Sequence, residues 1–139
     1  MKKNLKIADK LRSSGLRPTK QRIQIAKFLF EREKTFHFTV EDLDHLINLK
    51  EKKDKISLAT FYNTVHSFKK AGHLKEILTN NNKNYFDTNV SSHHHFFDEK
   101  NNELTDINSK EIELKNIPAA PKGKKIKDID VIINIDNHS

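Results

Sequence analysis

Three consecutive histidines, His93, His94 and His95, are the side chains of this sequence with the clearest capacity for chemistry. Successive side chains of a β-strand point to opposite faces, so a strand here would place His93 and His95 on one face and His94 on the other. Two imidazoles on one face form a suitable pair of ligands for iron, zinc or haem, although further ligands must come from elsewhere. A surface strand with a chance run of histidines is the alternative interpretation.

A second candidate site is the amphipathic segment from Ser57 to Ala71. Its large apolar residues recur three and four positions apart and should face a core. They are Leu58, Phe61, Val65 and Phe68. The opposite face holds small or hydrogen-bonding residues without a carboxylate: Ser57, Ala59, Thr60, Tyr62, Asn63, His66 and Ser67. Such a face suits a helix that enters the major groove of DNA, although an ordinary surface helix has a similar pattern.

Basic residues accompany this segment. Lys69 and Lys70 end it, whereas Arg17, Lys20 and Arg22 surround the start of an earlier helix. Contacts to phosphate fix the register of a protein on DNA without reading sequence, and arginine also enters narrow minor grooves. A solvated basic surface is the alternative for both groups.

The charge of the chain is unevenly distributed. Its 139 residues have a formal net charge of +7. Residues 1–88 hold 19 Lys or Arg against 10 Asp or Glu, whereas residues 89–139 hold 7 against 9. A basic first part and a mildly acidic second part indicate two roles, and the first part suits a polyanion.

Composition also removes several classes of protein. The chain has no cysteine, which excludes disulfides, a cysteine-ligated zinc and a cysteine nucleophile. It has no run of about 18 apolar residues for a membrane span, and no apolar core of a signal peptide follows Met1. We therefore expect a cytoplasmic protein without a membrane partner and, since no catalytic motif is evident, not an enzyme.

Hydrophobic periodicity predicts four helices and a hairpin in the first part. Gly15 ends the first helix, Pro18-Thr19 opens the second, and Thr39 with Asp42 caps the third. The fourth is the segment 57–71, and residues 73–78 and 83–87 form the hairpin. This order indicates an α+β protein with a winged-helix DNA-binding domain over residues 1–88.

The second part, residues 89–139, follows a polar hinge at residues 88–92 and is predicted to be a β-rich dimerisation and effector-sensing domain. Strands are expected at 93–98 and 103–107 around an Asn101-Asn102 turn, near Ile112 and Leu114, and at 129–135. Pro118 and Pro121 leave room for a short helix at best. About 50 residues bury too little apolar surface alone, so we expect a homodimer.

Three stretches resemble the ferric uptake regulator superfamily in order and spacing: Gly15 to Arg22, Thr39 to Leu43, and Ser57 to Thr64. The stretch from Tyr85 to Phe97, with its three histidines, and Asn63 after the tyrosine resemble the iron response regulator (Irr) branch found in α-proteobacteria. The resemblance implies a repressor of iron and haem genes, with haem as its effector. It also implies a homodimer on a palindromic, AT-rich operator.

The resemblance further implies roles for individual residues. Tyr62 would touch bases, Arg17 would enter the minor groove, and Arg22 would support phosphate contacts. His37 and Asp87 match positions that complete a metal site with His93 and His95, for Fe²⁺, Mn²⁺ or Zn²⁺. Haem would use His93, His94 or His95.

The sequence departs from the superfamily at several positions, and His94 stands where many members have Asp. The structural zinc held by cysteines cannot form. In the second metal site Glu113 matches one ligand, but the position of a late histidine falls near Ile129. The Cys-Pro haem motif of some Irr proteins is missing, so any haem must be held by histidine.

Three other functions remain open from the sequence. The chain could sense Fe²⁺, Mn²⁺ or Zn²⁺ directly, without haem. It could be a histidine-metal hydrolase, which needs an open coordination position and a general base near the metal. It could also coat nucleic acid without preference for a palindromic operator.

Overall fold

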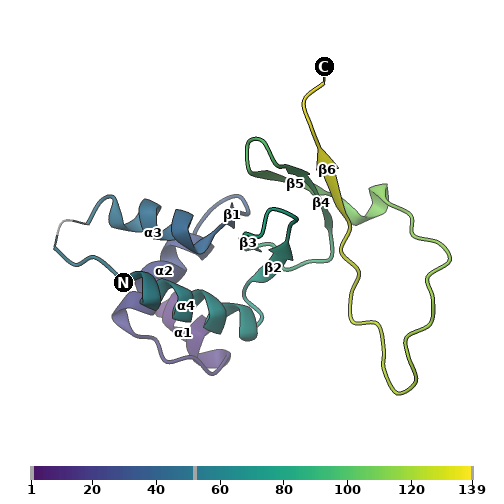
Figure 1. The fold of residues 1–139 in the computed structure, drawn as a ribbon. Helices are drawn as coiled ribbons and strands as arrows, with labels where there is room; N and C mark the ends of the chain where they lie inside the picture. The colour runs from purple at the N-terminus through teal and green to yellow at the C-terminus, as the bar shows by residue number, and fades with distance from the viewer. Residues whose placement is uncertain (1, 52, 139) are drawn as a thin grey trace. The chain divides into compact units, whose positions relative to one another are not determined.

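A computed structural model of the chain describes residues 2–51 and 53–138, with side chains from residue 6 onward. The chain divides into two compact units, Met1–Val90 and Ser91–Ser139. In the described residues, unit 1 combines helices with a small sheet, whereas unit 2 is built on a second sheet (Figure 1).

The helices of unit 1 begin and end close to the predicted positions. They are α1 (Lys2–Ser13), α2 (Lys20–Phe30), α3 (Val40–Asn48) and α4 (Leu58–Lys70). Thr39 and Asp42 form the predicted capping box of α3, and the Ser57 hydroxyl caps α4 by accepting a hydrogen bond from the Thr60 amide. Gly15 follows α1 with a φ of +82°, a backbone conformation that glycine adopts without steric cost.

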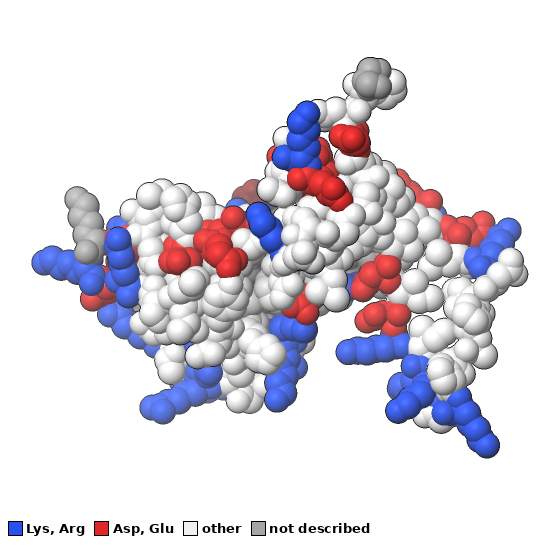
Figure 2. Space-filling model, viewed as in Figure 1, with Lys and Arg blue, Asp and Glu red and all other residues white. Residues whose placement is uncertain are grey.

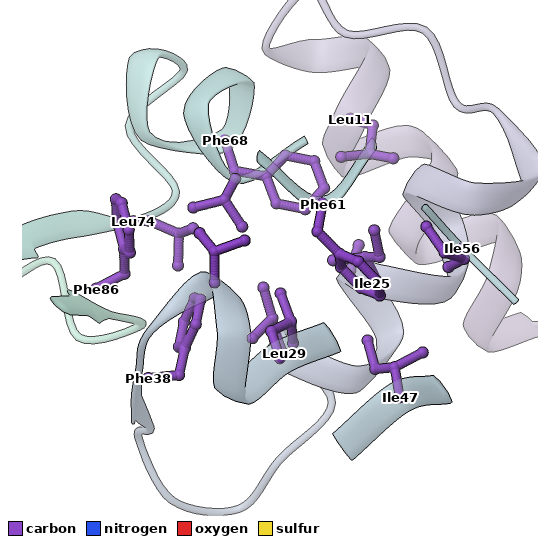
Figure 3. Close-up of a cluster of buried hydrophobic side chains, with 14 of the residues drawn as sticks. Leu11, Ile25, Leu29, Phe38, Ile47, Ile56, Phe61, Phe68, Leu74 and Phe86 are labelled. Atoms are coloured by element: carbon purple, nitrogen blue, oxygen red, sulfur yellow. The ribbon is translucent and has the colours of Figure 1, made fainter. Parts of the chain in front are cut away.

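The core of unit 1 lies between these helices and the sheet (Figure 3). Its largest fully buried side chains include Phe38, Phe61 and Phe68, with Leu11 and Leu29 from the first two helices. Burial of one such side chain contributes about 1.5–3 kcal/mol. The apolar face of α4 is therefore a major part of this core, and it fixes which side of the helix is exposed.

The buried face of α4 differs from the prediction at one end. Leu58 was expected to be buried but is 43% exposed, whereas Thr64 is buried beside Phe61, Val65 and Phe68. With 100° between successive residues, Leu58 lies at the edge of the stripe centred on these four residues. It also lies in the first turn of the helix, so tertiary packing and not periodicity decides its exposure.

The sheet of unit 1 contains the predicted hairpin and one unpredicted strand. Strands β2 (Lys75–Leu78) and β3 (Asn84–Asp87) pair antiparallel, and β1 (His37–Phe38) pairs with the other edge of β3. The segment before α3 lay outside the predicted helices and hairpin, and the structure places a short strand there at His37 and Phe38. Two residues are too few for a period-2 pattern, and pairing with β3 holds them.

Unit 2 contains a sheet of three strands in the order β5-β4-β6. Strands β4 (His94–Asp98) and β5 (Glu103–Ile107) are antiparallel around the predicted asparagine turn, where Asn102 has a φ of +55°. Strand β6 (Ile132–Ile135) runs parallel to β4 on its other edge. The histidine segment is thus the central strand, except that His93 lies one residue before it.

The remainder of unit 2 differs from the prediction. No strand forms at Ile112 and Leu114. A short 3₁₀ helix, η1 (Ser109–Glu111), precedes a long connection to β6 that has no regular structure. The last strand covers only the second half of the predicted range 129–135, and its Ile133 and Ile135 are 39% and 41% exposed. Among the described residues, no helix has the length and apolarity to span a membrane.

Candidate DNA-binding surface and candidate metal centre

The exposed face of α4 carries the predicted hydrogen-bonding residues. Tyr62 is 46% exposed, Asn63 and His66 are exposed, and Thr60 is half-buried. Ser57 and Ala59 are exposed near the start of the helix. The helix itself carries no carboxylate. This face of α4 is therefore largely exposed to solvent, as the helical period predicted.

The predicted basic residues lie at the surface as well. Arg17, Lys20 and Lys69 are exposed, and Arg22 is half-buried because its guanidinium donates a hydrogen bond to the Arg17 carbonyl at 3.1 Å. Lys20 lines a small hollow of about 260 Å³ with lysines that precede α4, Lys53 and Lys55. Unit 1 thus presents positive charge around the start of α2 and the approach to α4.

Figure 2 shows lysine and arginine side chains on unit 1 and a second group at the tip of the long connection in unit 2. The long connection of unit 2 carries four exposed lysines, Lys122, Lys124, Lys125 and Lys127. These four residues are more than half of the seven basic residues of the second part. The rest of unit 2 is therefore more acidic than its total charge suggests.

Two acidic side chains beside α4 modify the candidate DNA-binding surface. The Tyr62 hydroxyl donates a hydrogen bond to the carboxylate of Glu41, which lies in the first turn of α3. The Lys69 ammonium lies 2.8 Å from the carboxylate of Glu76 on β2. The predicted roles of Tyr62 and Lys69 took no account of these partners, because both come from other elements.

The first group of candidate metal ligands lies in unit 1, on paired strands. His37 on β1 is opposite Asp87 on β3, and its Nε2 lies 3.0 Å from the Asp87 carboxylate. The same carboxylate accepts a hydrogen bond from the Asn89 amide at 2.8 Å. Asp87 is fully buried, and a buried carboxylate needs such compensation of its charge. The strand pairing brings together the two residues that the family resemblance singled out.

The second group lies in unit 2. The Nε2 atoms of His93 and His95 lie 3.2 and 3.1 Å from the same carboxylate oxygen of Asp106 on β5. The two imidazole rings are 4.4 Å apart between centroids, so the predicted shared face of these histidines is confirmed. Asp106 is opposite His95 in the strand register.

The tautomer of a neutral His93 makes this group suitable for a cation. Its Nδ1 donates a hydrogen bond to the Ser91 carbonyl at 2.7 Å, so a neutral His93 directs the lone pair of Nε2 toward Asp106. Two electron-pair donors at this separation need a proton or a metal ion between them. Ligands about 2.1 Å from one ion are about 3.0 Å apart in octahedral geometry and about 3.4 Å apart in tetrahedral geometry, which fits these separations.

Asp106 is the candidate metal ligand that sequence reasoning missed. A signal for it existed, because a turn at Asn101-Asn102 pairs Asp98 with Glu103 and therefore His95 with Asp106. The register of a hairpin follows from its turn, so the predicted strands contained this pairing.

His94 points away from this group, as the alternation of a strand predicts. Its Nδ1 accepts a hydrogen bond from the Val131 amide at 3.0 Å. The proton of a neutral His94 is then on Nε2, which in that form has no lone pair for iron. Glu113, the candidate for a second metal site, is exposed, and its carboxylate is 3.7 Å from the Lys115 ammonium.

Comparison with known proteins adds to this geometry. No curated protein sequence matches the chain. A ferric uptake regulator from Pseudomonas aeruginosa solved with manganese is 21% identical, with a TM-score of 0.69 over 94% of this chain and 97% of that chain. One from Francisella tularensis solved with iron is 21% identical, with a TM-score of 0.71 over 88% and 92%.

A zinc-bound manganese uptake regulator is 27% identical, with a TM-score of 0.70 over 95% of this chain and 98% of that chain. These likenesses confirm the predicted fold class, an α+β chain with a winged-helix domain and a small β-rich domain. The sequence model of the Ferric uptake regulator family matches residues 13–134, so the chain belongs to that family.

Proposed function

We propose that this chain is a metal-responsive transcription regulator that binds operator DNA through α4. Its family consists of transcription regulators, and similar structures hold manganese, iron or zinc. The observation that carries the proposal is the Asp106 carboxylate, which lies within 3.2 Å of two imidazole Nε2 atoms. A set of two nitrogens and one oxygen suits Fe²⁺, Mn²⁺ or Zn²⁺.

We assign His93, His95 and Asp106 as ligands from unit 2, and His37 with Asp87 as ligands from unit 1. Asp87 and His93 are separated by only five residues, Thr88 to Ser92. A fully extended chain of six residues spans about 20 Å at most, so the length of the linker would allow both groups to bind one ion. A bound divalent ion would supply positive charge that compensates the carboxylates of Asp87 and Asp106.

This assignment gives the chain a way to couple effector to DNA. Ligands drawn from both units would restrict their relative positions, and these positions set the spacing of the two α4 helices in a dimer. A dimer reads two half-sites about one helical turn apart, or a multiple of one turn. A bound ion would favour the spacing that fits DNA only to the extent that it binds this arrangement more tightly than the other arrangements of the dimer.

A homodimer is part of the proposal. Strand β6 is at the edge of its sheet, and its Ile133 and Ile135 are about 40% exposed. An exposed edge strand with apolar side chains is a surface that a second copy can cover. The expected operator is therefore palindromic, with Arg17, Lys20, Arg22 and Lys69 near phosphates or the minor groove. Ser57, Ala59, Thr60, Tyr62, Asn63 and His66 would face base edges.

The Irr-like function with haem as effector is the finer prediction from sequence, and it makes a different demand on these residues. Haem would need an axial nitrogen from His93, His94 or His95. The hydrogen bond from Val131 to His94 and the contacts of His93 and His95 with Asp106 favour the metal ion instead.

The test is a DNA-binding titration with a labelled duplex that the chain selects from random sequence. Metal-free protein should bind this duplex more tightly after addition of Mn²⁺, Fe²⁺ or Zn²⁺, with random duplex at the same salt as control. Mutation of His93 and His95 to alanine should remove the response. If haemin produces a Soret band and changes DNA affinity while the metals do not, the haem function replaces this one.

A further inference from the structure

The contact between Tyr62 and Glu41 extends the proposed function, on which this inference rests. Tyr62 is on α4, Glu41 is in the first turn of α3, and these two helices pack against each other. The phenol donates its hydrogen bond to the Glu41 carboxylate. We propose that Glu41 is a positioning residue that fixes the Tyr62 ring for contact with a base and keeps phosphate away from it.

Glu41 is well placed to hold this contact. Its backbone is fixed by the capping box of Thr39 and Asp42, whose two hydrogen bonds are each 3.1 Å long. The positive end of the α3 dipole stabilises a carboxylate in the first turn. The hydrogen bond to Glu41, with a smaller effect of burial, raises the pKa of Tyr62 above its ordinary value of 10.0. The phenol therefore keeps its proton.

The contact determines what Tyr62 can offer to DNA. Its hydroxyl proton is engaged with Glu41, so it is not available to a base or a phosphate. Tyr62 is 46% exposed. Its ring therefore remains available for an apolar contact, for example with the methyl group of thymine. A ring that is already held in place loses less conformational entropy when it binds.

The negative charge of Glu41 beside the ring also favours contact of Tyr62 with a base. Glu41, Tyr62 and Glu76 line a groove of about 490 Å³ between α3, α4 and the β2–β3 hairpin. Lys69 compensates Glu76, whereas Glu41 has the neutral phenol as its partner. A fixed negative charge at this place repels the DNA backbone, so it favours the register in which a base edge and not a phosphate meets Tyr62.

The experiment measures how strongly the chain senses a thymine methyl group. The probe is a duplex that the full-length wild-type chain selects from random sequence with Mn²⁺ present. Each thymine is replaced in turn by deoxyuridine, which removes only the methyl group. At the contacted thymine the wild-type chain should lose about fourfold in affinity, the effect of one buried methyl-sized group.

Three variants separate positioning from general binding. Glu41→Ala should reduce the deoxyuridine effect to less than about twofold, since the ring is no longer held. Glu41→Gln retains an oxygen that accepts the hydrogen bond and should keep the fourfold effect, while affinity for random duplex rises as the negative charge is lost. Tyr62→Phe should reduce the deoxyuridine effect as much as Glu41→Ala does. The double variant should reduce this effect no further than either single variant.

Glu33→Ala is the control, because it removes the same charge from an exposed residue outside the groove. It should keep the fourfold effect. The inference is overturned if Glu41→Ala is as sensitive to deoxyuridine as the wild-type chain, or if a selective wild-type chain senses no methyl group. If the wild-type chain selects no sequence at all, the proposed function fails and this inference fails with it.

Discussion

Replacement of Asp106 by alanine should lower the affinity of the chain for Mn²⁺ by about a hundredfold. Residues that only orient metal ligands change affinity by about 10- to 100-fold when mutated. A carboxylate oxygen 3.2 and 3.1 Å from two imidazole nitrogens would contact the ion itself, so its effect should reach at least the upper end of that range. A hundredfold loss corresponds to about 2.7 kcal/mol.

The same substitution should have little effect on the metal-free chain. The Asp106 side chain is 34% exposed, so its removal leaves no large cavity. Removal of the carboxylate also takes a second electron-pair donor away from the Nε2 atom of His93. At a pH where both histidines are neutral, the midpoint of thermal unfolding without metal should stay near that of the wild-type chain. The stabilisation by saturating Mn²⁺ should fall by the same 2.7 kcal/mol or so, because ligand linkage follows affinity.

Isothermal titration of metal-free protein with Mn²⁺, at constant pH and salt, measures the affinity. Glu103→Ala is the matched control, since Glu103 is on the same strand and three positions away, on the opposite face. It should bind Mn²⁺ like the wild-type chain. Affinity of Asp106→Ala within about threefold of wild type would show that Asp106 is not a ligand, and the assignment of unit 2 as a metal-binding unit would lose its basis.

Other predictions concern stability and assembly. Phe61→Ala should cost about 3–5 kcal/mol in urea unfolding and Leu58→Ala less than about 0.5 kcal/mol; equal costs would contradict the exposure of Leu58. Burial, and then the charge of Lys10, lower the pKa of His73 below 6.5. The unfolded chain therefore binds a proton at His73 more readily than the folded chain, so the free energy of unfolding should fall as the pH drops through 6.5. His73→Gln should weaken the dependence of the melting temperature on pH. If the melting temperature of the variant depends on pH as strongly as that of the wild-type chain, His73 is not the source of this dependence. Ile133→Asp should shift the chain toward monomer in sedimentation equilibrium, and an unaltered dimer would remove β6 from the interface.

Much of unit 1 followed from short-range patterns in the sequence. The capping box of Thr39 and the cap at Ser57 depend on residues three positions apart, and the buried stripe of α4 depends on helical period. Such features are local, so a sequence window contains all the information that decides them. The shared face of His93 and His95 is of the same kind, since the alternation of a strand needs no knowledge of its neighbours.

Local sequence patterns could not supply the long-range partners of most residues, apart from the pairing of His95 with Asp106 that the register of the predicted hairpin contained. His37 meets Asp87 because a two-residue strand pairs with β3, fifty positions further along the chain. Glu41 reaches Tyr62 through the packing of α3 on α4, and tertiary packing leaves Leu58 43% exposed. These contacts join residues that are distant in sequence, and the packing that creates them is a property of the whole unit. Residue types and local periods thus determined which side chains were available for chemistry, whereas the tertiary structure decided which of them meet.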